Sequence, residues 1–173
     1  MSPSAAQAAT SVPGTEKILA IDYGRARIGL AIAEAQHGLA QPLTTLERVN
    51  RNEDMRRLRE LVRDHSVKLV VVGLPLRLDG TRGEMAEETE RFAQRIRKQI
   101  GVAVEMADER LTSWEAERQL EEQFGRRSKV SDSTGKKKAA EKFSVDSMAA
   151  AILLRDYMAR RSGVTAEAPN EAT

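Results

Sequence analysis

The chain has 173 residues, of which 31% are charged and 40% hydrophobic, and its formal net charge is +2. This composition is typical of one soluble globular domain and excludes a disordered or fibrous chain. The absence of cysteine excludes disulfides, thiolate metal sites and thiol nucleophiles, which favours a cytoplasmic protein. No apolar stretch approaches the roughly 20 residues that cross a bilayer.

Both ends of the chain are rich in small and polar residues. Residues 1–15 lack the basic start and apolar middle of an export signal, and residues 162–173 contain no apolar run. We predict that both segments are disordered tails. One folded domain, of residues 16–161 and without an internal repeat, is then expected between them.

The first predicted elements are two strands joined by a tight turn at residues 23–27. Apolar residues precede this turn and follow it, as in a hairpin. Asp22 ends the first apolar run, at a position where a buried strand normally avoids charge. We interpret Asp22 as a working residue near the hairpin end, with Arg25 and Arg27 close by.

The middle of the chain predicts a third strand, a helix and a fourth strand. Residues 41–47 would complete an antiparallel meander, with proline near the start of the strand, where a missing donor is tolerated. Asn52 is the predicted N-cap of the following helix. Residues 67–73 form a nearly continuous apolar run, which is typical of a strand covered on both faces.

The rest of the chain alternates in the same way. An apolar stripe within residues 85–100 predicts a helix that Gly101 closes, and residues 102–107 predict a fifth strand. Residues 112–115 match a capping box that opens another helix, and apolar spacing within residues 145–157 predicts the last one. The predicted fold is α/β, in the order βββαβαβαα. Its five-stranded mixed sheet joins the antiparallel meander to parallel strands and carries helices on both faces.

Four acidic residues are expected at one edge of this sheet. Asp22 ends the first strand, Asp108 and Glu109 follow the fifth, and Asp146 lies in the first turn of the last helix. The carboxyl ends of parallel strands share an edge, where ligands bind. An oxygen-only cluster suits Mg²⁺ or Mn²⁺, and two such ions can promote phosphodiester hydrolysis. Each acid taken alone has an alternative explanation. Asp146 can stabilise the N-terminus of its helix, and Glu109 can form an ion pair with Arg110.

The basic side chains are concentrated in one segment. Residues 126–142 hold seven Lys or Arg against two acidic residues, a surplus of five positive charges. Such a concentration produces a directed field that can attract a polyanion. A solvated lysine-rich loop is the alternative explanation.

Four motifs resemble those of the YqgF family, also called RuvX. In chain order they are IDYGRARIGLA from residue 21, VGLPLRLDGT from residue 72, DERLT from residue 108 and VDSMAA from residue 145. They occur in the family's order and span nearly all of the expected folded region. The chain departs from the family at Arg77, where Asn is common, and at Ser113, where a second Thr is common.

The resemblance implies a ribonuclease H-like fold, related to the RuvC Holliday junction resolvases. It also implies a Mg²⁺- or Mn²⁺-dependent nuclease that processes the 5′ end of precursor 16S ribosomal RNA in ribosome biogenesis. By position, the family's catalytic, metal-binding acids fall on Asp22, Glu109 and Asp146, with Asp108 as an auxiliary ligand. The residues then expected to bind nucleic acid are Arg25, Arg27, Arg77, Arg126, Arg127, Lys129, Lys136, Lys137, Lys138 and Lys142.

Three other functions share some of these features. A Holliday junction resolvase would use the same acids on branched DNA, and a non-catalytic RNA-binding factor would need only the basic residues. A sugar kinase or actin-like ATPase also carries an Asp-x-Gly sequence after its first strand, but such proteins pair two of these domains and need a far longer chain. The sequence leaves the choice between RNA and branched DNA open, and it gives no oligomeric state.

Overall fold

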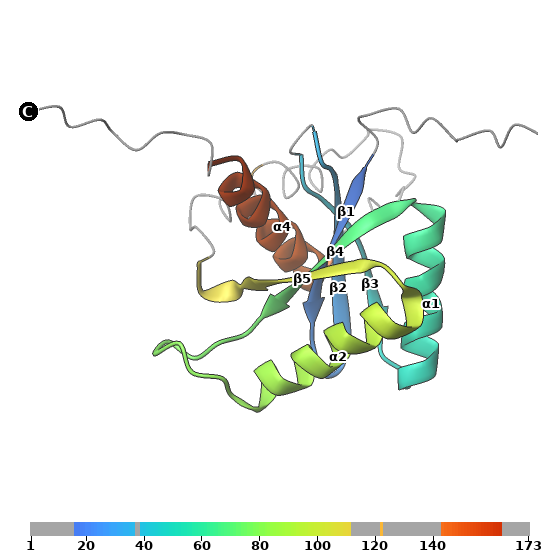
Figure 1. The fold of residues 1–173 in the computed structure, drawn as a ribbon, viewed down its shortest axis with the longest axis horizontal. Helices are drawn as coiled ribbons and strands as arrows, with labels where there is room; N and C mark the ends of the chain where they lie inside the picture. Colours follow the sequence, from blue (N-terminus) through green and yellow to red (C-terminus); the bar gives the residue numbers. More distant parts are fainter. Residues whose placement is uncertain (1–15, 37–38, 112–121, 123–142, 164–173) are drawn as a thin grey trace, which may run out of the picture.

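The computed structural model describes residues 16–36, 39–111, 122 and 143–163 (Figure 1). The tail expected at residues 1–15 lies outside these ranges, as does most of the tail expected at residues 162–173. The same holds for the capping box at residues 112–115 and for the basic residues of the segment 126–142. Residues 162 and 163 belong instead to the last helix, so the prediction was wrong for these two residues. No helix of the described ranges is long and apolar enough to span a membrane.

Five strands form a single mixed sheet in the order β3-β2-β1-β4-β5. Strands β1 and β2 pair antiparallel, as do β2 and β3, whereas β4 runs parallel to β1 and β5 parallel to β4. The carboxyl ends of β1, β4 and β5 therefore share one edge, and the predicted mixed sheet is confirmed. The strands are β1 (Lys17–Tyr23), β2 (Arg27–Glu34), β3 (Gln41–Glu47), β4 (Val67–Leu74) and β5 (Ala103–Asp108).

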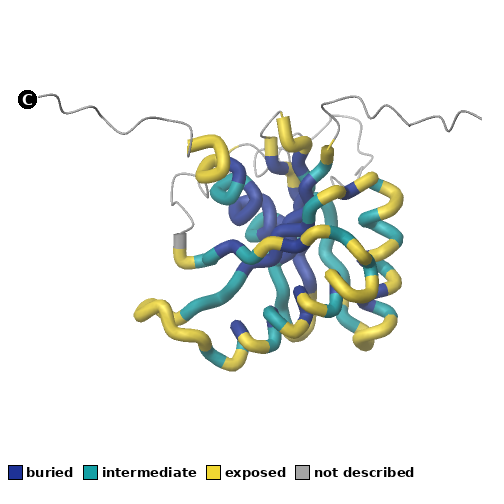
Figure 2. Tube along the Cα trace, in the orientation of Figure 1, coloured by how far each residue is buried: buried dark blue, intermediate teal, exposed yellow. Residues whose placement is uncertain are grey.

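Helices cover both faces of the sheet, as predicted (Figure 1). α1 (Arg51–Asp64) and α2 (Glu84–Ile100) pack on one face, and α4 (Val145–Gly163) packs on the other. Successive side chains of a strand point to opposite faces. Leu19 in β1 accordingly joins the core under α1 and α2, while Ala20 joins the core under α4. The most deeply buried part of the chain is this sheet (Figure 2).

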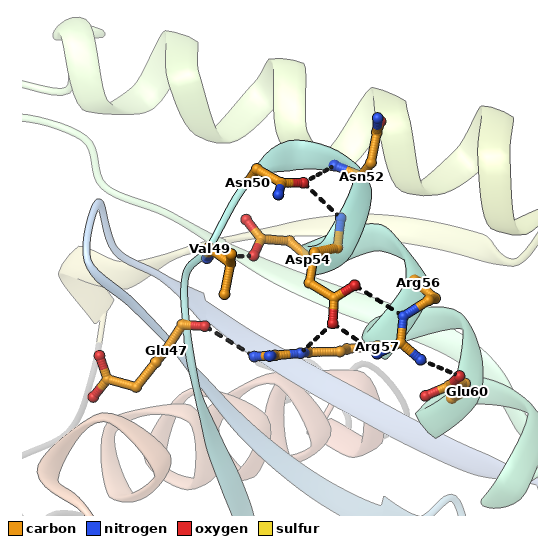
Figure 3. A network of polar contacts seen from close by, with 9 residues as sticks. Glu47, Val49, Asn50, Asn52, Asp54, Arg56, Arg57 and Glu60 are labelled. Atoms are coloured by element: carbon orange, nitrogen blue, oxygen red, sulfur yellow. Dashed lines mark hydrogen bonds and ion pairs between the residues drawn. The ribbon is translucent and has the colours of Figure 1, made fainter.

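The start of α1 differs from the prediction. The N-cap is Asn50, not Asn52, because the Asn50 side chain accepts hydrogen bonds from the backbone amides of Asn52 (3.1 Å) and Glu53 (2.9 Å) (Figure 3). Asn50 is extended, with φ −159° and ψ 168°, as an N-cap residue must be. Asn52 already belongs to the first helical turn.

The boundaries around β5 decide how the acids are presented. Gly101 ends α2 in the left-handed conformation, at φ 76°, as predicted. Strand β5 begins at Ala103 and includes Asp108, one residue beyond the expected end. Glu109 then starts the short 3₁₀ turn η1 (Glu109–Leu111), so these two neighbouring acids lie in different backbone environments.

Candidate active site

Asp22 lies next to the last residue of β1, at the carboxyl edge of the sheet, as predicted. It pairs across the sheet with Gly29 of β2, and it is half-buried although the four residues before it are fully buried. The hairpin turn follows at once, with the Gly24 amide donating to the Arg27 carbonyl at 2.9 Å. The apolar strand thus carries one carboxylate to the edge of the core.

Glu109 meets Asp22 at this edge, since the two carboxyl groups form a hydrogen bond. Burial, and then the negative charge of Asp22, raise the pKa of Glu109 to about 7. Burial, and then the charge of Asp146, raise the pKa of Asp22. A protonated Glu109 donates to the Asp22 carboxylate, so the pair shares a proton under conditions in which isolated carboxyl groups have lost theirs.

Asp146 approaches the same edge from the first turn of α4. Its charge acts on Asp22, as stated above, while its own carboxylate is held by Arg27, with 3.0 Å between Nε and Oδ2. The side chains of Arg27 and Asp146 are 56% and 31% exposed, so the ion pair lies at the surface. The structure therefore brings together the three acids expected from the sequence, with a guanidinium on one of them.

Two glycines make room for the acids, and neither was expected from the sequence to shape the site. A Cβ atom on Gly29 would overlap the backbone carbonyl of Asp146, and a Cβ atom on Gly73 would overlap the carboxyl group of Glu109. Gly29 thus admits the start of α4 against β2, and Gly73 admits the Glu109 side chain against β4. A glycine inside a strand pattern is a known signal of such close approach.

Asp108 faces a different partner. Arg110 binds its carboxylate through the backbone amide (2.9 Å), Nε (3.1 Å) and Nη2 (2.7 Å). This contact lowers the pKa of Asp108, the opposite of the effect at Glu109. The ion pair with Arg110 that the sequence suggested for Glu109 is formed by Asp108 instead. Asp108, the expected auxiliary metal ligand, is therefore already bound to a positively charged side chain.

The arginines expected to bind nucleic acid divide into two groups. Arg25 reaches α2, where its Nη2 lies 2.8 Å from Glu88 and 3.3 Å from Glu84, and Arg27 holds Asp146. The Arg77 guanidinium, in contrast, forms no ion pair or hydrogen bond with any residue in the described ranges. The remaining expected contacts, Arg126, Arg127, Lys129, Lys136, Lys137, Lys138 and Lys142, lie outside those ranges.

Arg48 fixes the turn that follows Asp22, and nothing in the sequence patterns indicated this role. Its guanidinium donates to the Tyr23 hydroxyl (2.9 Å) and to the carbonyls of Gly24 and Arg25 (3.3 Å each), while Asp54 accepts from Nε at 3.1 Å. The Asp54 side chain is only 3% exposed. The hairpin is thereby tied to the start of α1, which restricts the backbone on the carboxyl side of Asp22.

The donor set at the edge consists of carboxylate oxygens, which are the ligands of hard divalent cations. Among the described residues, no group of three or more Asp, Glu or His side chains is arranged so that it could hold a metal ion. The site instead has a hydrogen-bonded carboxyl pair, Asp22 and Glu109, and a third acid bound to Arg27.

Sequence comparison relates the chain to proteins of one family. The RuvX family model, described as Holliday junction resolvase, matches residues 16–160. A relative from Chloroflexus aurantiacus (strain ATCC 29366 / DSM 635 / J-10-fl) is 42% identical over 84% of this chain and 88% of its own length. One from Anaeromyxobacter sp. (strain K) is 38% identical over 84% of this chain and 98% of its own length. Both bear the name "Putative pre-16S rRNA nuclease".

Solved structures give the same fold. RuvC from Thermus thermophilus superimposes with a TM-score of 0.52 at 15% identity, over 85% of this chain and 96% of RuvC. These values confirm the expected ribonuclease H-like fold. The family model and the relatives confirm the family that the four motifs predicted. This family belongs to the nucleases, which are hydrolases. The chain belongs to the RuvX family.

Proposed function

We propose that this protein is a divalent-cation-dependent endonuclease that hydrolyses phosphodiester bonds at the 5′ end of precursor 16S ribosomal RNA. The observation that carries the proposal is the carboxyl pair of Asp22 and Glu109, with Asp146 beside it, at the carboxyl edge of the sheet. The relatives' names suggest the substrate, and a cytoplasmic location is part of the proposal.

The three acids fit a divalent cation by the chemistry of their oxygen donors, although their side chains are not arranged around one in this structure. Two carboxyl groups in contact are stable only if they share a proton or a cation, and both pKa values are raised here. A bound Mg²⁺ or Mn²⁺ ion would supply the missing positive charge without a proton. We assign Asp22, Glu109 and Asp146 as its ligands. Asp108 is the weaker candidate, because a cation would have to displace Arg110.

The protein's own groups have distinct roles in this proposal. Asp22 is the central ligand, because it interacts with both of the other acids. Glu109 binds a cation only after losing its proton, and its pKa is raised to about 7, so cation binding should strengthen as the pH rises. When bound, the ion would activate the attacking water and stabilise the leaving oxygen. Arg27, which a cation at Asp146 would release, is assigned to a substrate phosphate.

The second candidate function is resolution of branched DNA by the same site. This candidate is supported by the description of the family and by the fold shared with T. thermophilus RuvC. RuvC has also been solved in complex with a Holliday junction substrate. That RuvC complex superimposes with a TM-score of 0.51 at 19% identity, over 88% of this chain and 98% of RuvC, so it carries the fold alone. We favour RNA because relatives at 38% to 42% identity carry the ribosomal RNA name.

The test is cleavage-site mapping with the full-length protein. A precursor 16S RNA fragment with its 5′ extension and a four-way DNA junction are each incubated with Mg²⁺, Mn²⁺ or EDTA. We expect metal-dependent cleavage of the RNA at a defined position, and none by Asp22→Asn. Asp64→Asn is the matched control, since Asp64 lies on the surface of α1 and pairs with Arg63. Cleavage of the junction alone would favour the second candidate, and full activity of Asp22→Asn would exclude the assigned site.

A further inference from the structure

The segment between β4 and α2 holds the most exposed large apolar side chain of the described residues. Leu78 is 96% exposed, more than Val145 at 84%, Val49 at 62% or Leu39 at 50%. The segment projects beyond the sheet, and its tip is exposed (Figures 1 and 2). The apolar surface of Leu78 is therefore available to a partner, and its burial there would be favourable.

Leu78 is nevertheless held in place by its backbone. The Gly80 amide donates to the Arg77 carbonyl (2.8 Å) and the Arg77 amide donates to the Thr81 carbonyl (2.9 Å), with Gly80 at φ 85°. This is the pattern of a hairpin loop that turns through a left-handed glycine. Asp79 accepts hydrogen bonds from the Thr81 amide (2.9 Å) and hydroxyl (2.6 Å). The loop therefore presents Leu78 without needing to be ordered on binding.

The loop is also connected to the candidate active site. It begins where β4 ends, and Leu74 is aligned in the sheet with Asp108, the neighbour of Glu109. The guanidinium of Arg110 contacts the Leu78 carbonyl at 3.4 Å while it binds Asp108. Leu78 is thus linked through the Arg110 guanidinium to Asp108, the neighbour of Glu109.

Arg77 favours a polyanion as the partner of Leu78, since the other flanking charge, Asp79, is turned toward the Thr81 amide and hydroxyl. Arg77 directly precedes Leu78, and the Arg77 guanidinium is without an ion pair or hydrogen bond among the described residues. Nearby Arg82 and Arg110, by comparison, bind Glu90 and Asp108. A guanidinium contacts phosphates, and an apolar side chain such as leucine can insert beside an unstacked base.

We propose that Leu78 packs against an unstacked base next to the cleaved phosphodiester, while Arg77 binds an adjacent phosphate. The loop of residues 75–83 is then a specificity element that selects sites where a base can leave its stack. This inference rests on the proposed nuclease function and adds to it the residue that recognises the nucleotide conformation. A protein partner at Leu78 is the competing possibility, and it would leave the nucleic acid measurements unchanged.

The experiment uses the full-length protein and the precursor RNA, with 2-aminopurine placed beside the junction between the 5′ extension and the mature 16S sequence. Binding is followed in EDTA by 2-aminopurine fluorescence, which rises when a base is unstacked. We expect a clear rise with wild type and with Leu78→Met, and a rise several-fold smaller with Leu78→Ala. Leu39→Ala is the matched control. Leu39 lies in the connection between β2 and β3, at the opposite end of the strands from Asp22, and its variant should behave as wild type.

Cleavage kinetics supply the second measurement. With Mg²⁺ or Mn²⁺, Leu78→Ala should raise KM about tenfold and leave kcat nearly unchanged, because contact area is lost but the acids are not disturbed. Equal fluorescence and equal KM for Leu78→Ala, Leu39→Ala and wild type would overturn the inference. A fluorescence rise that depends on Leu78, without cleavage by wild type in any metal, would instead reject the nuclease function and leave the base contact standing.

Discussion

Two glutamates in this molecule have opposite surroundings. Glu53 on α1 accepts hydrogen bonds from Arg56 at 2.6 Å and from Arg57 at 3.0 Å, and these contacts lower its pKa to about 2. Glu109 at the sheet edge faces Asp22, and burial together with that negative charge raises its pKa to about 7. The α1 surface matches each carboxylate with a cation, as Figure 3 shows for Arg56 and Glu60, whereas the sheet edge places carboxylates together.

The difference shows where the fold tolerates electrostatic repulsion. Arginine is abundant throughout the chain, and Arg110 lies directly after Glu109 in sequence, yet its guanidinium binds Asp108. Clustered carboxylates that remain apart from available cations lower stability unless something else neutralises them. Perturbed pKa values of this kind concentrate at functional sites. The comparison therefore supports a cation or substrate site at the sheet edge and an ordinary solvated surface on α1.

The largest difference between the two regions is expected when one carboxylate is neutralised in each of them. We expect Glu109→Gln to lower the rate of RNA cleavage by about 10³-fold or more, since a ligand worth several kcal/mol to the transition state is lost. Glu53→Gln should leave the rate unchanged. Single-turnover cleavage in Mg²⁺ and Mn²⁺ measures both. Equal cleavage rates for the two variants would show that Glu109 is not part of the active site.

A second variant separates geometry from charge. Gly29→Ala would push the start of α4 away from β2, because its new Cβ atom would overlap the Asp146 carbonyl. We expect about a 10²-fold loss of cleavage, since displacement of a catalytic group by about 1 Å can cost that much. Gly163→Ala, with open space around the added methyl group, is the control and should retain full activity. An unaffected rate for Gly29→Ala would mean that the position of Asp146 is unimportant.

The pH dependence of stability should also differ between the two regions. The pKa of Glu109 is higher in the folded state, about 7 against an ordinary 4.5, so folding takes up a proton. This group's contribution is complete below about pH 4.5 and is lost as the pH rises through about 7, which lowers stability by about 2 to 3 kcal/mol. Urea denaturation in EDTA at pH 5 and pH 8 should show this loss for wild type. Glu109→Gln should lack most of it, and an unchanged slope in that variant would place the effect elsewhere.

Much of the architecture could be predicted from local patterns. Apolar runs on both sides of residues 23–27 predict the hairpin, because alternate side chains of such strands enter two cores. The convergence of Asp22 with residues 108–109 follows from the parallel strands, whose carboxyl ends share an edge. These predictions needed only the period of the pattern and the direction of the strands.

The remaining details depend on contacts that no local pattern contains. Asp108 and Glu109 are adjacent acids, and the one that reaches Asp22 is selected by the strand ending at Asp108. Arg25 lies near Asp22 in sequence but pairs with Glu88, 63 positions away on α2. The N-cap of α1 shows the same limit, since two asparagines two positions apart satisfy the same sequence rule.

The smallest expected effect is on the thermal stability of the α1 surface. Glu53→Gln removes two ion pairs from the surface of α1, but exposed pairs contribute little because water screens them and long side chains lose freedom in forming them. We expect Tm to fall by at most about 2 °C at low ionic strength and by less in 1 M salt, measured by thermal denaturation. Gln in place of Glu109 should instead raise the Tm of the metal-free protein at pH 8, since it removes a buried like-charge contact. The same substitution would then change stability in opposite directions in the two regions, as a matched surface and a repulsive site require.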